Sequence, residues 1–194
     1  MAKVKGPLFS LGATGQIAKT LVYGVWKGVA YARQHIIPAN PKTADQQEQR
    51  GFFTSAIDAW HTDGYTEEDV KAFNLYALAQ KMAASGFNIF VKLYINAKIA
   101  ALTWTALTNC LISTITSSGC TVDISVASDQ TGILYIGTSK TSMLDQFVGT
   151  WETDKYTFTV EGLNADTKYY FYIANTIAGE AARTGIYSFK TTAV

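Results

Sequence analysis

The first forty residues alternate hydrophobic and polar positions in the way that predicts a small antiparallel sheet. The alternation runs through residues 20–26 and 29–37, and the Lys27-Gly28 pair between them has the length of a hairpin turn. A shorter strand is expected at residues 8–11, followed by a glycine-rich turn at residues 12–15. Three strands of this size are marginal alone, so this sheet is expected to need a partner surface.

The sheet is expected to end at Pro38 and Pro41, because proline lacks the amide hydrogen that a strand or a helix would use. Thr43 then offers its hydroxyl to the free amides of a new helix, and Gln46 three residues later completes a capping box. Such a cap contributes about 1 kcal/mol, which is enough to define the start of the helix. A β-arm is therefore predicted to join a helix through a stiff proline segment.

The hydrophobic spacing after Thr43 is that of amphipathic helices. A first helix is expected to about Trp60. A second is expected from Thr66, whose following carboxylates suit the positive end of a helix dipole, to Ser85-Gly86. Residues 87–98 fit a third helix, although Ile89-Phe90-Val91 would also suit a strand; we favour the helix. The expected buried stripes are Phe53, Ala56, Ile57 and Trp60 in the first helix and Val70, Phe73, Tyr76, Ala77 and Gln80 in the second.

The pattern changes again after residue 103, where threonine, serine, glycine and β-branched residues dominate. Residues 101–107 are expected to be a linker or a first strand. Strict alternation at 122–126 and 156–160, with turn residues between short strands and a final strand at 185–192, predicts a β-sandwich of about 90 residues. The fold class is therefore α+β: a small antiparallel sheet and three helices, followed by an all-β sandwich.

These changes of pattern divide the 194 residues into three parts: a β-arm for docking at 1–42, a helical module at 43–103 and the sandwich at 104–194. With 48% hydrophobic and 16% charged residues, the chain has the composition of a globular protein. No run of about eighteen apolar residues predicts a membrane span, and no secretion signal is recognisable.

Charge is distributed unevenly along the chain, although the net charge is only +1. The arm carries no acidic residue. Residues 104–194 have five basic and eight acidic side chains, a net charge of −3. Two explanations of the basic arm are equally good. One is that its charge serves solubility only, and the other is that it serves docking onto an acidic partner or nucleic acid. The basic residues of the arm are Lys3, Lys5, Lys19, Lys27, Arg33 and Lys42.

No group of residues has the spacing of a catalytic, cofactor-binding or metal site, so the chain is expected not to be an enzyme and to need no cofactor. His35 and His61 lie on different elements, away from cysteine or carboxylate partners. If Cys110 and Cys120 flank a hairpin that turns at Ser117-Ser118, Cys110 faces Ser125 rather than Cys120, so free thiols are expected.

The segment from residue 6 to 95 resembles a group of small virion proteins of tailed phages and prophages. The resemblance rests on Trp-Lys-Gly at 26–28, the Pro-Ala-Asn-Pro-Lys-Thr sequence at 38–43 and the Gln-Gln-x-Gln-Arg helix at 46–50. It implies a structural part of a virus particle, a component of the head (such as a capsid decoration) or of the tail, assembled in the host cytoplasm. Its partners would be other copies of the chain or other virion proteins, and no reaction is implied.

The residues after Leu163 resemble the second half of a fibronectin type III domain. Leu163, Thr167, Tyr169, Phe171 and Ile173 have its spacing, and Ser-Phe-Lys-Thr follows at 188–191. The resemblance implies that Leu163 fills the core and that the Tyr169 hydroxyl ties the turn to the backbone, as in a tyrosine corner. The early-strand tryptophan of that family is missing, so Val122 or Ile124 is expected to fill its space.

Subunit contacts are expected on the arm through Tyr23, Trp26, Tyr31 and Arg33, because tryptophan, tyrosine and arginine are enriched at such contacts. Packing of the same aromatic residues on the helices remains the alternative. Two other functions also remain open. One is a surface adhesion or glycan-binding module that recognises a host glycan through the sandwich. The other is an architectural nucleic-acid-binding protein, which the lack of a basic stripe on the helices makes the less favoured interpretation.

Overall fold

The computed structural model describes residues 2–3, 14–37, 39–40, 42–127, 132–175 and 178–193. The chain divides into two compact units, Met1–Thr43 and Ala44–Val194. The boundary between these two units, after Thr43, therefore lies next to the predicted boundary at residue 42. The predicted strand at 8–11, the first half of the turn at 12–15, and Pro38 and Pro41 lie outside the described residues.

The N-terminal unit is a four-stranded antiparallel sheet in the order β1-β4-β3-β2. Lys27 and Gly28 form the predicted two-residue turn, with φ of 50° and 76°, between Trp26 and its partner Val29. Gly15 was expected in a turn but begins the strand β2. The turn between β2 and β3 lies instead at residues 18–20. The strands are β1 (Ala2–Lys3), β2 (Gly15–Ile17), β3 (Leu21–Trp26) and β4 (Val29–Gln34).

The three predicted helices are present as α1 (Ala44–Thr62), α2 (Glu67–Ala79) and α3 (Gly86–Ile99). Thr66 begins α2 as expected, through a capping box with Asp69. Ser85-Gly86 was expected to end this helix, but Ser85 caps the start of α3 instead, where its hydroxyl accepts a bond from Asn88 N–H. A serine suits a helix start better than a helix end because its oxygen can serve a free amide.

Aromatic side chains form the core of the helical part, and Phe90 lies at its centre with no exposed surface. The ring centres of Trp60 and Tyr65 both lie 5.0 Å from that of Phe90, and Phe73 and Trp104 lie within 6 Å of it. Offset and edge-on ring pairs of this kind are favoured by the aromatic quadrupole. Phe53, predicted to be in the buried stripe of α1, is instead 47% exposed.

The sandwich consists of two antiparallel four-stranded sheets, β10-β11-β7-β6 and β14-β12-β8-β9. This strand order is that of a fibronectin type III-like sandwich with one additional short edge strand, β10. Strands β9 and β10 are additions to the sequence prediction. The strands are β6 (Thr108–Ser113), β7 (Gly119–Ser125), β8 (Gly132–Gly137), β9 (Asp145–Val148), β10 (Thr150–Glu152), β11 (Lys155–Glu161), β12 (Lys168–Asn175) and β14 (Tyr187–Lys190).

The sandwich core follows the predicted alternation, and Val122 and Ile124, expected to replace the missing tryptophan, are both fully buried. The predicted pairing of Cys110 with Ser125 is wrong, because a bulge after Thr108 shifts the register and Thr108 itself pairs with Ser125. Cys110 and Cys120 are both free thiols.

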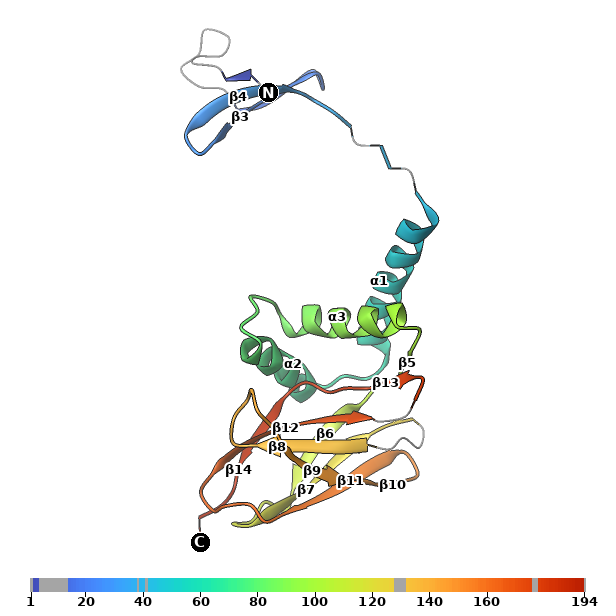
Figure 1. Ribbon diagram of the computed structural model, residues 1–194, viewed down its shortest axis with the longest axis vertical. Coiled ribbons are helices and arrows are strands. Elements are labelled where there is room, and N and C mark those ends of the chain that lie inside the picture. The colour runs from blue at the N-terminus through green and yellow to red at the C-terminus, as the bar shows by residue number, and fades with distance from the viewer. Residues whose placement is uncertain are drawn as a thin grey trace. The chain divides into compact units, whose positions relative to one another are not determined.

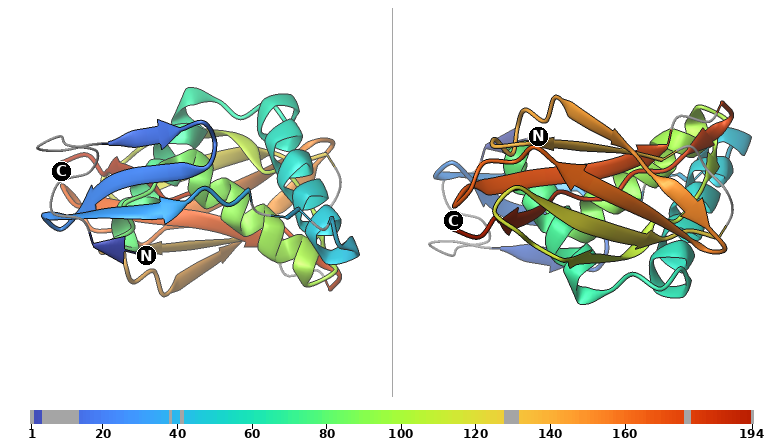
Figure 2. Two further views of the ribbon diagram at one scale, coloured as in Figure 1. Left: turned by 90° about the horizontal axis from the view of Figure 1, so that it is seen from above. Right: turned by 90° about the horizontal axis from the view of Figure 1, so that it is seen from below.

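The helices and the sandwich belong to one compact unit, so residue 103 does not divide this part of the chain. Helices α2 and α3 lie over one end of the sandwich, and the C-terminus lies at the opposite end (Figure 1). Viewed from that opposite end, the strands lie in front of the helices (Figure 2, right). Residues 101–107 contain β5 (Thr103–Trp104), which pairs in parallel with β13 (Glu180–Ala181) and continues from the helices into the sandwich.

Candidate interaction surfaces

The four predicted contact residues of the arm lie on two faces of its sheet. Gly24 pairs with Tyr31, Trp26 with Val29, and Val22 with Arg33, and residues directly opposite each other share a face. Trp26, Tyr31 and Arg33 therefore lie on one face, and Tyr23 lies on the other. Tyr23 and Trp26 cannot share a face, because an odd number of positions separates them along the same strand.

The face with Trp26 combines aromatic surface with positive charge. The Trp26 side chain is 69% exposed, and the Lys27 Nζ lies 5.2 Å from its ring centre. The Tyr31 ring covers Gly24, where a Cβ would come within 2.7 Å of the tyrosine hydroxyl oxygen. Gly24 thus lets Tyr31 lie flat across the strands, which leaves Trp26 projecting.

Hydrophobic side chains are exposed on both faces of the arm. Within residues 14–37 no residue is buried, so this part of the sheet has no core of its own. Ordering a residue costs about 1–2 kcal/mol of backbone entropy, which burial normally offsets. The arm therefore has the composition of an interface without its partner. Its exposed hydrophobic residues are Ile17, Leu21, Val25, Trp26, Val29, Ile36 and Ile37.

The residues predicted to have structural roles lie at the expected elements. Helix α1 begins at Ala44, immediately after Thr43, and Gln46 lies in its first turn. Leu163 is partly buried against the sandwich core. The Tyr169 hydroxyl accepts a hydrogen bond of 2.9 Å from Asn164 N–H, which is the contact that a tyrosine corner predicts.

Asp69 was predicted only as a carboxylate near a helix start, but it joins α2 to the sandwich. Its side chain is fully buried and accepts hydrogen bonds from Thr66 N–H at 2.8 Å, Asn109 N–H at 2.9 Å and the Tyr187 hydroxyl at 2.6 Å. Cys110 N–H adds a longer contact of 3.4 Å. A buried carboxylate needs such partners, because an unpaired one is costly to remove from water. Adjacent to it, Ile186 N–H donates to the carbonyl of Ala72 in α2.

The tyrosine and cysteine side chains next to Asp69 are held in their neutral, protonated forms. Burial raises the pKa of Tyr187 well above its ordinary value of 10.0, and the neighbouring Cys110 and Asp69 raise it further. Burial, followed by the charges of Asp69 and Asp123, raises the pKa of Cys110. Burial raises the pKa of Cys120 to about 11. These thiols are therefore poor nucleophiles at neutral pH.

A second connection between α2 and the sandwich is formed by Arg183. Its guanidinium carbon lies 4.6 Å from the ring centre of Tyr76 and 4.2 Å from that of Tyr172, so the cation stacks between helix and sheet. Tyr172 stacks in turn on Tyr135, with ring centres 4.8 Å apart. The sequence contained no pattern that would pair Arg183 with Tyr76.

No cluster of three histidine, cysteine or carboxylate side chains able to hold a metal occurs in the part of the chain that the structure describes. Within the same residues, no helix is both long and apolar enough to span a membrane.

No protein-family model matches the sequence, and no curated protein matches it. Solved structures similar to the chain include the fibronectin type III domain of human fibronectin type III domain containing protein 3, with 18% identity and a TM-score of 0.36 over 48% of this chain and 89% of that one. The sensor domain of the anti-sigma factor RsgI4 of Pseudobacteroides cellulosolvens has 16% identity and a TM-score of 0.32, over 46% of this chain and 94% of the other. The FN5 domain of Drosophila Lar has 16% identity and a TM-score of 0.33, over 48% and 99%. TM-scores this low do not establish a relationship to these proteins. The C-terminal sandwich is fibronectin type III-like because of its strand order and its tyrosine corner.

Proposed function

We propose that this chain is a non-enzymatic structural protein of a tailed-phage or prophage particle, which docks through its N-terminal unit and displays its sandwich. The resemblance of residues 6–95 to small virion proteins supports the proposal, as does the division of the chain after Thr43. In this function, Met1–Thr43 is the attachment unit and Ala44–Val194 is the displayed body.

The observation that carries the proposal is the exposed surface of the arm. Strands β2, β3 and β4 contain no buried residue, and Trp26 is 69% exposed, so this part of the sheet needs another surface to cover it. Among the residues that the structure describes, the edge strands β1 and β2 each pair with one neighbouring strand, which leaves backbone groups at which another chain could extend the sheet. The basic side chains of the arm favour an acidic partner surface, such as another copy of the sandwich region or another virion protein.

Deletion of residues 1–37 tests the proposal. The truncated chain should keep the folded unit Ala44–Val194, measured by circular dichroism, and should be missing from purified particles, measured by quantitative mass spectrometry. Trp26→Ala and Arg33→Ala should each weaken incorporation by about 1–2 kcal/mol or more, the range for interface anchors. Gln34→Ala, an exposed polar change on the same sheet, is the matched control and should incorporate normally. Normal occupancy of the truncated chain would refute docking through the arm.

A further inference from the structure

Large hydrophobic side chains are exposed at two places on the sandwich. The first lies on and just after β6, where Leu111 and Ile115 are exposed. The second follows residues 144–151, where Leu144 and Val148 are 81% and 71% exposed and Trp151 is exposed as well. Strands β6, β9 and β10 each pair with one neighbouring strand among the described residues, so each is an edge of its sheet. Both places therefore combine apolar surface with backbone groups that a further strand can reach.

Strands β9 and β10 belong to one continuous segment, which passes from one sheet to the other at Gly149. Gly149 N–H donates a hydrogen bond of 3.2 Å to the carbonyl of Gly132. A Cβ on Gly149 would come within 2.7 Å of the Phe158 ring, so glycine lets the backbone lie this close to the core. We call residues 144–154 the β9–β10 edge; near its centre, this edge is therefore held against the core of the sandwich.

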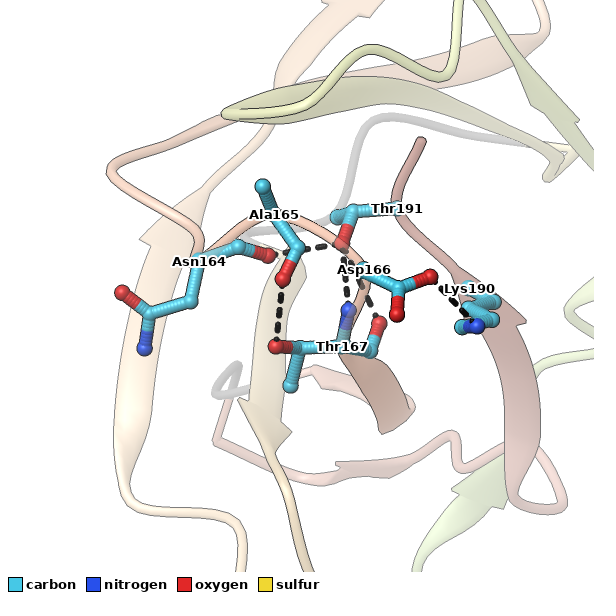
Figure 3. Close-up of polar contacts among 6 residues, drawn as sticks. All are labelled: Asn164, Ala165, Asp166, Thr167, Lys190 and Thr191. Atoms are coloured by element: carbon cyan, nitrogen blue, oxygen red, sulfur yellow. Dashed lines mark hydrogen bonds and ion pairs between the residues drawn. The ribbon is translucent and has the colours of Figure 1, made fainter. Parts of the chain in front are cut away.

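Some carboxylates of the sandwich are already paired with a lysine of the same chain. Figure 3 shows the Lys190 ammonium group at the Asp166 carboxylate, with which it forms an ion pair. The Lys155 ammonium group lies 3.9 Å from the Asp123 carboxylate. A neighbouring positive charge offsets the attraction of each carboxylate for a further cation. These two carboxylates are therefore less able to attract a basic segment of another molecule.

The three carboxylates of the β9–β10 edge have no such partner. Asp145, Glu152 and Asp154 are exposed, and none of the ion pairs between described residues includes them. Residues 141–154 contain no lysine or arginine, so these three carboxylates give the segment a charge of −3. Residues 108–118, which include the other exposed apolar place, contain no charged residue. Of the two places, the β9–β10 edge is therefore the one that is both apolar and negatively charged.

The N-terminal arm has the complementary properties. Residues 14–37 contain three basic residues and no acidic one, and they expose hydrophobic side chains on both faces of the sheet. Because every arm is basic, two arms repel each other, whereas an arm and a β9–β10 edge attract each other. Pro38 and Pro41 restrict the backbone of the segment that would have to fold the arm back onto its own sandwich. A second copy of the chain is therefore the favoured source of an arm for this edge.

We propose that the β9–β10 edge of one copy binds the arm of a second copy. The arm adds a strand to the edge, its apolar side chains contact Leu144 and Val148, and its basic side chains pair with the three carboxylates. Every copy has one arm and one edge, so the contact is head-to-tail and links copies into a ring or a filament. The inference deepens the proposed function and rests on it, because it names the partner of the attachment unit.

The full chain should be tested by analytical ultracentrifugation over a wide range of protein and salt concentrations. It should self-associate, and added salt should weaken the association because the pairing charges are exposed. An edge variant that combines Val148→Lys and Glu152→Lys should associate about tenfold more weakly, or less still. Its matched control combines Ser188→Lys and Glu161→Lys, which change the charge equally at exposed positions outside the edge, and should associate as the unchanged protein does.

A mixture of two defective variants tests the head-to-tail contact itself. An arm variant that combines Trp26→Ala and Arg33→Ala should also associate about tenfold more weakly, but it keeps an intact edge. The edge variant keeps an intact arm. An equimolar mixture should therefore form a 1:1 dimer through one intact contact, and nothing larger, because the remaining arm and the remaining edge are both defective.

Three results would overturn the inference: a full chain that is monomeric at every concentration, self-association that the edge variant does not weaken, or a mixture that forms no 1:1 dimer. The particle assay separates failure of this inference from failure of the proposed function. If only the inference fails, the edge variant enters particles at normal occupancy while the chain without residues 1–37 stays out. If the chain without residues 1–37 enters particles normally, the proposed function fails, whatever the association in solution.

Discussion

Replacement of Asp69 should destabilise the helices and the sandwich together. In Asp69→Ala, Asn109 N–H and the Tyr187 hydroxyl lose the acceptor that they reach at 2.9 and 2.6 Å. Hydrogen bonds to a charged group contribute about 1.5–3 kcal/mol each, and the lost capping box at Thr66 adds about 1 kcal/mol. The simple sum is about 4–7 kcal/mol. Since water can enter the vacated space, we expect a loss of about 4 kcal/mol, a large share of the 5–15 kcal/mol typical of a domain.

Urea denaturation at neutral pH, followed by far-UV circular dichroism and by tryptophan fluorescence, measures this loss. Trp60 and Trp104 lie in the helical core, so coincident transitions would show that helices and sandwich unfold as one unit. Glu68→Ala is the matched control. Its side chain is 66% exposed in the same helical turn and forms only a surface ion pair with Lys71, so the change should stay within about 0.5 kcal/mol.

A double-mutant cycle tests the reasoning more directly. Asp69→Ala and Tyr187→Phe should each be destabilising, and because neither variant can form this bond, their combination should show a coupling energy of about 1.5–3 kcal/mol, the range for a hydrogen bond to a charged group. Asp69→Asn keeps the volume of the side chain and should remain folded. A loss below about 1 kcal/mol in Asp69→Ala, or no coupling in the cycle, would show that Asp69 does not hold the two parts together.

Three further predictions concern stability. Tyr169→Phe should cost about 1 kcal/mol in urea denaturation through loss of the bond from Asn164 N–H, and an unchanged midpoint would contradict the corner. Gly185→Ala should cost about 1–3 kcal/mol, because a Cβ there would overlap the backbone of α2. Gly51→Ala on open helix surface should instead stabilise by about 0.5–1 kcal/mol, and similar effects of both would refute the packing argument. The buried Cys120 and Tyr187 are expected to make stability depend on pH, because their pKa values are higher in the folded state than in the unfolded state. The free energy of unfolding should keep its full value below about pH 9. It should fall above that pH by about 1.4 kcal/mol per pH unit for each group that is deprotonated only in the unfolded state. Tyr187→Phe should make this fall shallower above pH 10, and an equal slope would argue against the raised pKa.

Local patterns were sufficient to predict the three helices and most of the strands of this fold. The period of two located β3 and β4, the Lys27-Gly28 pair specified their turn, and Thr66 marked the start of α2. The α+β class and the β-sandwich followed from the same reasoning, whereas its fibronectin type III-like character was expected from the resemblance of the residues after Leu163. These features depend on residues that are close in sequence, which is the reason that a single sequence predicts them.

Features that depend on distant contacts were missed. Glu67, Glu68 and Asp69 are equivalent as carboxylates in a first helical turn, and only docking on the sandwich distinguishes the buried Asp69 from its exposed neighbours. The bulge after Thr108 likewise has no local turn sequence. The placement of Tyr23 and Trp26 on opposite faces did not depend on distant contacts. Their odd spacing along one strand was enough to predict it. Strand β9, which pairs with β8, is a further element that the alternation did not predict.

The bond between Asp69 and Tyr187 spans 118 residues, and this separation affects how the chain folds during synthesis. The ribosome releases α2 long before β14, so the Asp69 carboxylate lacks its Tyr187 partner until the last strand of the sandwich is made. The docking of α2 on the sandwich is therefore completed late, and long-range closure of this kind slows folding. Loss of even the final strand, by a premature stop or by a protease, would remove the Tyr187 partner of Asp69 and one of the surfaces on which the helix that begins at residue 67 packs.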